Sequence, residues 1–232
     1  MSRRLLPCGQ HAVLVELDGL EEVLSLAGAV RAAIDAGDLA FADVVDVVSA
    51  ARTLLVVVGD DTEVTSVRGA LSALPANGMN GMNGTAGSPG GASRPGSPPV
   101  VEIPVHYDGP DLDEVAKLTG LSPDEVVAAH TQTRWQAAFT GFSPGFAYLA
   151  GGDDRLRVPR RLEPRTSVAA GSVGLAGEFS AVYPGSSPGG WQLLGHTDLI
   201  LWDVDRSPPA LLQPGSVVRF TNADVQDNGT VR

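Results

Sequence analysis

A stretch with few large apolar side chains divides this chain into two unequal parts. Residues 76–99 read ANGMNGMNGTAGSPGGASRPGSPP and are rich in glycine, serine, asparagine and proline. Such a segment cannot bury enough apolar surface to offset the entropy lost when its backbone is ordered. We therefore predict a flexible linker over residues 76–99, between a first domain over 1–75 and a second over 100–225, with a tail over 226–232.

The first part alternates between strand and helix patterns. Val13, Val15 and Leu17 lie at alternate positions and predict a half-buried strand over Ala12–Leu17. The remaining elements expected here are a helix over Leu20–Ala36, strands over Val44–Ser49 and Thr53–Val58, and a last helix from Asp61 or Thr62 to about Leu74. This order predicts a small α+β sandwich of the ferredoxin-like type.

The second part begins with a strand and two helices and then changes character. A strand over Val100–His106 precedes a helix over Asp111–Leu118, and Ser122 to Glu125 form a capping box for the next helix. From Thr133 onward, short apolar runs are separated by glycine and proline, which predicts a mainly-β barrel or sandwich. The expected strands are Phe146–Leu149, Val173–Ala176, Trp191–Leu194, Leu199–Trp202 and Val217–Phe220.

The composition excludes several functional classes. The net charge is −11 and Lys117 is the single lysine, so a nucleic-acid partner is not expected. No apolar run approaches the roughly 20 residues that span a bilayer, and no apolar region follows Arg3 and Arg4 as in an export signal. We therefore expect a cytoplasmic protein without a membrane partner. A single cysteine, Cys8, and four histidines without metal-ligand spacing also predict no metal site.

Arginines are concentrated just after residue 150. Five of them lie within eleven residues: Arg155, Arg157, Arg160, Arg161 and Arg165. Two interpretations stay open. Either the arginines form a solvated loop that balances nearby acids, or they bind a carboxylate or phosphate, because a guanidinium binds planar anions through two parallel hydrogen bonds.

Two segments match the serine-hydrolase pattern G-x-S-x-G, at residues 141–145 and 185–189. In that site the N–H group after the serine stabilises the oxyanion, but here Pro144 and Pro188 have no N–H. Residues 170–177 resemble a glycine-rich phosphate loop but lack its Lys-Ser/Thr ending, so a turn between strands is favoured. His130 ends a predicted helix, either as a cap or as part of a site.

Four motifs together carry a family resemblance: GFSPGFAYL at residues 141–149, DRLRVPRRLEPRT at 154–166, VAAGSVGLAG at 168–177 and YPGSSPGGWQLLGHT at 183–197. They resemble the family of KipI, the 5-oxoprolinase B subunit (PxpB) and allophanate hydrolase subunit 1. Gly109-Pro110-Asp111-Leu112 matches as well. The chain departs from the family pattern at Glu178 to Ala181, and His196 stands where the family has arginine.

The resemblance implies a ferredoxin-like N-terminal domain followed by a cyclophilin-like β-barrel. It also implies a hydrolase activity: the chain would be the B subunit of an ATP-dependent 5-oxoprolinase, which opens 5-oxoproline to glutamate together with subunits A and C. ATP with Mg²⁺ would serve the assembled enzyme, and this chain would be inactive alone. Two alternatives stay open. One is a component of the biotin-dependent urea carboxylase or allophanate hydrolase type, whose similar barrels are carboxyltransferase domains. The other is a non-catalytic inhibitor of a histidine kinase, as in KipI.

We assign candidate roles within these motifs. The expected catalytic residues are His130, Arg165 and Gln192. The expected contacts with substrate or another anion are Arg160, Arg161, Thr166, Gly171, Ser172, Ser187, Gly189 and Gly190. The aromatic residues expected to bind a partner subunit are Phe142, Phe146, Tyr148 and Trp191, because aromatic side chains are frequent interface hot spots.

Overall fold

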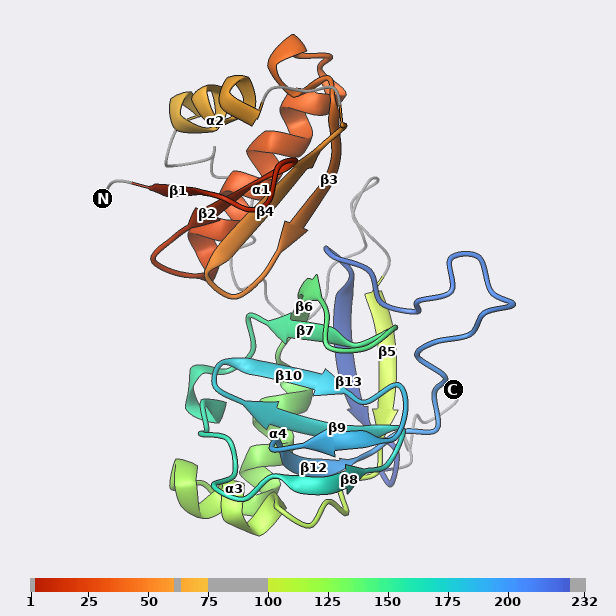
Figure 1. Cartoon of the computed structure of the whole chain (residues 1–232). Helices are drawn as coiled ribbons and strands as arrows, with labels where there is room; N and C mark the ends of the chain where they lie inside the picture. Colours follow the sequence, from red (N-terminus) through yellow and green to blue (C-terminus); the bar gives the residue numbers. More distant parts are fainter. Residues whose placement is uncertain (1–2, 61–63, 75–99, 226–232) are drawn as a thin grey trace, which may run out of the picture. The chain divides into compact units, whose positions relative to one another are not determined.

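The computed structural model describes residues 3–60, 64–74 and 100–225, which belong to two compact units (Figure 1). The predicted linker, 76–99, and the predicted tail, 226–232, lie outside the described residues. Among the helices of the described ranges, none is long and apolar enough to cross a membrane.

The first unit is a four-stranded antiparallel sheet with two helices. Its strands lie in the order β1-β2-β4-β3, so α1 connects two strands that are separated by a third. In chain order the elements are β1 (Arg4–Pro7), β2 (Ala12–Glu16), α1 (Leu20–Asp35), η1 (Leu39–Phe41), β3 (Val44–Ser49), β4 (Thr53–Val58) and α2 (Val64–Ala73).

Alternation along the strands builds the core of this unit. Val13 and Val15 of β2 are buried with Leu54 and Val56 of β4, while the side chains between them are half-buried. The apolar stripe of α1 packs on the same face and includes Val23, Leu26, Ala27 and Val30. The predicted strands and the first helix are thus confirmed.

The second unit is a seven-stranded sheet in the order β12-β9-β10-β7-β6-β13-β5, with a two-stranded ribbon of β8 and β11. All described pairings are antiparallel except that of β13 with β5. The elements are β5 (Val100–Val105), α3 (Leu112–Thr119), α4 (Pro123–Gln132), β6 (Trp135–Thr140), β7 (Ala147–Ala150), η2 (Asp154–Leu156), β8 (Arg165–Val168), β9 (Ser172–Ala176), β10 (Phe179–Val182), β11 (Ser187–Gly189), β12 (Gln192–His196) and β13 (Val217–Asn222).

The two edges of this sheet meet along a seam, which we define as residues 106–111 against β12. His106 and His196 exchange backbone hydrogen bonds of 2.8 and 3.0 Å. Gly109 N donates to Leu194 O at 3.0 Å, and Asp111 N donates to Leu193 O at 3.1 Å. The seam therefore joins β5 to β12 and makes the sheet a nearly closed barrel (Figure 1).

Two apolar clusters lie on opposite sides of the barrel strands. The larger cluster holds Val173 and Leu175 of β9 with Val115 of α3 and Val126 of α4, so both helices pack against the strands. The smaller cluster includes Ala176, Tyr183, Trp191 and Phe146. Glycine and proline break the strands into short segments, but the alternation within each segment keeps the two faces apolar.

The helices of the second unit follow their capping signals. Ser122 and Glu125 form both bonds of the predicted capping box before α4, and Gly120 ends α3 in the left-handed region at φ 72°. The prediction of a strand over Leu199–Trp202 is wrong, since only Trp202 forms an isolated bridge, with Ala210. Leu199 and Leu201 each pack on the core. Their burial explains the apolar run in the sequence without the hydrogen-bonded ladder of a strand.

His106 at the seam makes stability depend on pH. The rings of His106 and His196 stack at 5.1 Å, His106 Nδ1 lies 2.6 Å from Asp224 Oδ1, and His196 Nδ1 lies 2.9 Å from Asp108 Oδ1. The hydrogen bond to Asp224 raises the pKa of His106, and the charges of Asp224, Asp198 and Asp108 also raise it, against a lowering by burial.

Asp224→Asn is therefore expected to reduce stability more in acid than in base. Because the pKa of His106 is raised on folding, its protonated form stabilises the folded protein. This stabilisation is complete below the unfolded pKa of about 6.5 and is lost as the pH rises through the folded pKa. Urea unfolding at about pH 5.5 and about pH 8.5 measures the difference between the two proteins. Asp205→Asn, at an exposed loop position, is the control and should show no such dependence on pH. An Asp224→Asn effect that is equal at both pH values would contradict the prediction.

Candidate functional site

Asp111 holds two of the clustered arginines. Its carboxylate Oδ1 accepts hydrogen bonds from Arg161 Nη1 at 2.6 Å and Arg165 Nη2 at 2.8 Å, while Oδ2 accepts from Leu193 N at 2.7 Å. The Asp111 side chain is 3% exposed, whereas those of Arg161 and Arg165 are 33% and 23% exposed. One buried carboxylate thus connects the start of α3, the segment that leads into β8, and β12. We call the side chains of Asp111, Arg161 and Arg165 the Asp111 cluster.

Asp111 stays ionised in this cluster. Burial raises the pKa of its carboxyl group, but the hydrogen bonds from Arg165 and Leu193 N and the charges of Arg165 and Arg161 outweigh burial and hold the pKa below its usual value. The cluster therefore carries two positive charges and one negative charge at neutral pH.

Asp111 is the residue of this site that we did not predict. It lies at the N-cap of α3, yet its side chain makes no capping hydrogen bond there. Aspartate at an N-cap usually accepts from the first turn of its own helix, so the sequence gives no sign of the long-range contacts. The one available signal was the Gly109-Pro110-Asp111-Leu112 motif, which contained the residue without indicating its partners.

Two predicted catalytic residues, Arg165 and Gln192, have buried side-chain atoms without partners. Gln192 Nε2 donates to Pro159 O at 3.2 Å, which ties β12 to the arginine segment. Within the described residues, Gln192 Oε1, Arg165 Nη1 and Ser187 Oγ are buried and have no hydrogen-bond partner. These atoms are not open to solvent in this structure, so the structure does not test a contact with a ligand. The catalytic roles of Arg165 and Gln192 and the binding role of Ser187 stay predictions.

Arg160 differs from its two neighbours in the motif. Its side chain is exposed, and its guanidinium carbon lies 5.9 Å from the centre of the Trp191 ring. None of the ion pairs formed among residues 3–60, 64–74 and 100–225 involves Arg160. Burial raises the pKa of the nearby Tyr183 hydroxyl, while the charges of Arg160 and Arg165 act in the opposite direction. Arg160 is thus a positive charge that lies over an aromatic ring and has no carboxylate partner in the described structure.

His130 lies in the core, away from this cluster. It is fully buried, its Nδ1 is 2.8 Å from Tyr107 Oη and its Nε2 is 2.8 Å from Ser180 Oγ. Phe220 stacks on the ring at 4.1 Å. Burial lowers the pKa of His130 to about 3, so the ring is neutral and is not the protonated helix cap that its position suggested. The geometry gives His130 a structural role that links α4 to β10, and it does not support the predicted catalytic role.

The N–H groups of Gly171 and Ser172 are already occupied. Gly171 N donates to Tyr183 O at 2.7 Å and Ser172 N donates to Ala169 O at 3.3 Å, so neither N–H is free for an anion. Gly190 O accepts from Arg161 N at 2.8 Å, and a Cβ at Gly189 would overlap Tyr183 Oη. These glycines allow close approach between segments, which is a packing reason for the motif. Thr166 is exposed and makes no contact that assigns it a role.

The four aromatic residues predicted to bind a partner fall into two groups. Phe146 and Trp191 are buried in the smaller apolar cluster, so the prediction that they contact a partner is not supported. Tyr148 is half-buried and stacks on Phe139 at 4.4 Å. Phe142 is 61% exposed and has φ 69°, in the left-handed region that bulky residues rarely adopt. Phe142 therefore remains the best candidate for a partner contact.

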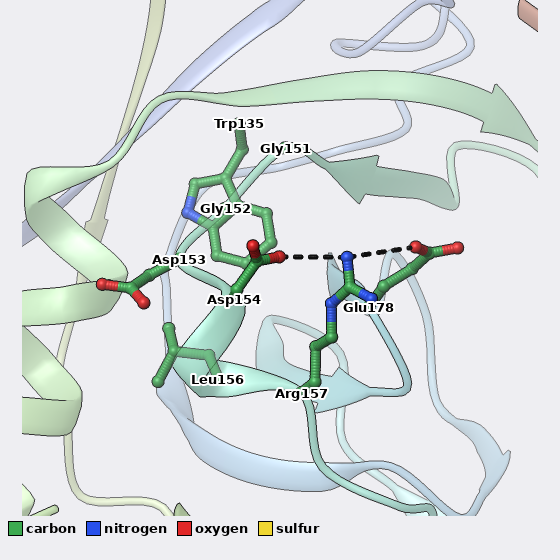
Figure 2. A pocket seen from close by; sticks show the side chains of 8 residues that line it. All are labelled: Trp135, Gly151, Gly152, Asp153, Asp154, Leu156, Arg157 and Glu178. Atoms are coloured by element: carbon green, nitrogen blue, oxygen red, sulfur yellow. Dashed lines mark ion pairs between the residues drawn. The ribbon is translucent and has the colours of Figure 1, made fainter. Parts of the chain in front are cut away.

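A cavity of about 50 Å³ lies elsewhere in the barrel unit, beside η2. Figure 2 shows Arg157 between Asp154 and Glu178, with ion-pair distances of 3.0 and 3.8 Å. Trp135 and Leu156 line the apolar side of the cavity (Figure 2). Because Arg157 is paired and the cavity holds little more than water, the arrangement is better explained as a contact between η2 and Glu178. Glu178 begins the segment where the chain departs from the family pattern, and its side chain is used in this contact.

Comparison with known proteins links the chain to named relatives. A family model described as the carboxyltransferase domain, subdomain C and D, matches residues 3–212. The B subunit of 5-oxoprolinase from Bacillus subtilis (strain 168) is 48% identical over 131 residues, or 55% of each chain. That of Escherichia coli O157:H7 is 51% identical over 123 residues, covering 52% of this chain and 56% of its own. The match thus spans about half the length of these curated relatives.

More distant relatives share the fold in longer chains. The crystal structure of TTHA0988 has a TM-score of 0.70 and 34% identity, covering 92% of this chain and 40% of that one. The urea amidolyase of Kluyveromyces lactis has a TM-score of 0.67 at 16% identity, covering 95% of this chain and 15% of that one, which indicates a shared fold alone. In sequence, the urea amidolyase of Saccharomyces cerevisiae is 29% identical over 129 residues, or 7% of its length.

Proposed function

Since the chain belongs to the carboxyltransferase-domain family of subdomains C and D, whose model matches residues 3–212, we propose that it is the B subunit of an ATP-dependent 5-oxoprolinase. The observation that carries the proposal is the 48% and 51% identity to two proteins of that name, against 29% to a urea amidolyase. The proposal places this chain's part of the active site in the barrel, where the arginine motif and β12 lie.

We further propose that the two units are a ferredoxin-like domain, with boundaries near residues 1–75, and a cyclophilin-like barrel near 100–225. The sheet order β1-β2-β4-β3, with α1 joining β2 to β3 around β4, supports the first assignment. The nearly closed seven-stranded barrel supports the second.

The proposed reaction is the ATP-dependent opening of 5-oxoproline to glutamate, in a complex with subunits A and C. The chemistry needs groups that stabilise the negative charge developing on the amide oxygen. Where the chain enters β9, the N–H groups of Gly171 and Ser172 are bonded within the chain, which favours binding of ATP and its Mg²⁺ by the other subunits. The exposed, strained Phe142 supports a partner contact beside the arginine motif.

Reconstitution tests the proposal. We expect the purified chain alone to show no ADP formation that depends on 5-oxoproline, and the chain with subunits A and C to show it, with glutamate as product. Release of glutamate and ADP is measured by coupled assays, with each subunit omitted in turn. Turnover with urea in place of 5-oxoproline would favour the carboxylase alternative, and inhibition of a histidine kinase without any turnover would favour the KipI-like one.

A further inference from the structure

We propose that Arg160, rather than Arg161 or Arg165, binds the carboxylate of the substrate. The inference rests on the proposed function and assigns one contact within it.

The Asp111 cluster already engages two of the three arginines. Arg161 and Arg165 both donate to Asp111 Oδ1, so a buried carboxylate, which also accepts from Leu193 N, offsets part of their positive charge. A buried ion pair of this kind is costly to break. The positive charge of these two side chains is therefore used to hold the seam and the segment that leads into β8.

Arg160 retains its full capacity for an external anion. It is exposed, it lies over the Trp191 ring, and within the described residues no carboxylate pairs with it. Contact with the Trp191 ring at a cation–π distance limits the movement of the guanidinium, so less side-chain freedom is lost when it binds a ligand. Its free edge can then donate two parallel hydrogen bonds to a carboxylate.

The aromatic group beside Arg160 has one exposed member, Phe142. Trp191 belongs to the smaller apolar cluster with Phe146 and Tyr183, and exposed Phe142 contacts this cluster at ring distances of 5.2 Å to Phe146 and 6.4 Å to Tyr183. Trp191, Phe146 and Tyr183 are 3%, 1% and 1% exposed, so Phe142 is the aromatic side chain of this group that can contact the five-membered lactam of 5-oxoproline, while Arg160 binds its carboxylate.

Removing the carboxylate from the substrate and the guanidinium from the enzyme tests the contact from both sides. In the reconstituted complex, kcat/KM is measured for 5-oxoproline and for 2-pyrrolidinone, the same lactam without the carboxylate. We expect Arg160→Gln to raise KM for 5-oxoproline about tenfold or more and to abolish most of the preference over 2-pyrrolidinone. Arg160→Lys should lose part of the preference, because it keeps the charge and loses the planar fork.

Arg155→Gln is the matched control, since Arg155 is exposed in the same segment and pairs with Asp153 at 2.6 Å. It should keep the wild-type preference. A wild-type preference that survives in both Arg160 variants would overturn the inference, as would a wild-type complex that uses the two lactams equally; the proposed function would stand in both cases. A wild-type complex with no 5-oxoproline turnover would overturn the proposed function and the inference with it.

Discussion

Asp111→Ala is expected to lower the free energy of unfolding of the barrel unit by about 3 to 5 kcal/mol, the usual cost of removing one partner from a buried ion pair. The substitution leaves Arg161 and Arg165 close together without their shared carboxylate, and it removes the acceptor of Leu193 N at the seam. All three contacts join segments that are distant in the chain, so the loss weakens the closure of the barrel.

Tryptophan fluorescence during urea unfolding measures this effect in the barrel unit, because Trp135, Trp191 and Trp202 are the three tryptophans of the sequence. Asp108→Ala is the matched control. Asp108 lies in the same seam but is exposed and pairs with His196, so its replacement should cost within about 1 kcal/mol. Asp111→Asn keeps an acceptor for Leu193 N and should be intermediate. Equal stability of the Asp111→Ala and Asp108→Ala proteins would refute the structural role.

Local patterns predicted much of the fold because their physics is local. The alternation that places Val13 and Val15 inward, and the capping box at Ser122 and Glu125, each depend on residues a few positions apart. The run Leu199–Trp202 looked equally strand-like, but no strand of the described residues pairs with it, and pairing is a property of the tertiary structure. Strands β6, β8, β10 and β11 were missed because polar residues, shortness or, in β11, proline and glycine hid their alternation.

The site was harder to predict because its contacts are long-range. The arginine cluster was visible in the sequence, but the sequence does not say which acid meets which arginine, and Asp111 lies 50 residues from Arg161. The same limit applies to His130. A histidine at a helix end is often exposed, and only the packing of Phe220 and the contact with Ser180 show that this one is buried and neutral.

Gly195→Ala is expected to prevent normal closure of the barrel, with a loss of about 3 kcal/mol or more. A Cβ at Gly195 would overlap the carbonyl oxygen of His106 and lie 3.0 Å from Tyr107 Cα. Both neighbours are backbone atoms of the seam, so no side-chain rotation relieves the overlap. The backbone of residues 106–107 must move away, which breaks the paired hydrogen bonds between His106 and His196.

Amide hydrogen exchange locates this damage, since the N–H groups of His106 and His196 should lose protection first in Gly195→Ala. Gly185→Ala is the control for replacing a glycine in the same motif. Nothing lies within 4 Å of a Cβ built at Gly185, and its backbone is outside the left-handed region, so its stability should stay within about 1 kcal/mol of wild type. If Gly195→Ala keeps full protection at the seam, the two edges of the sheet are not held together as the structure describes, and the position of Asp111 beside β12 would need another explanation.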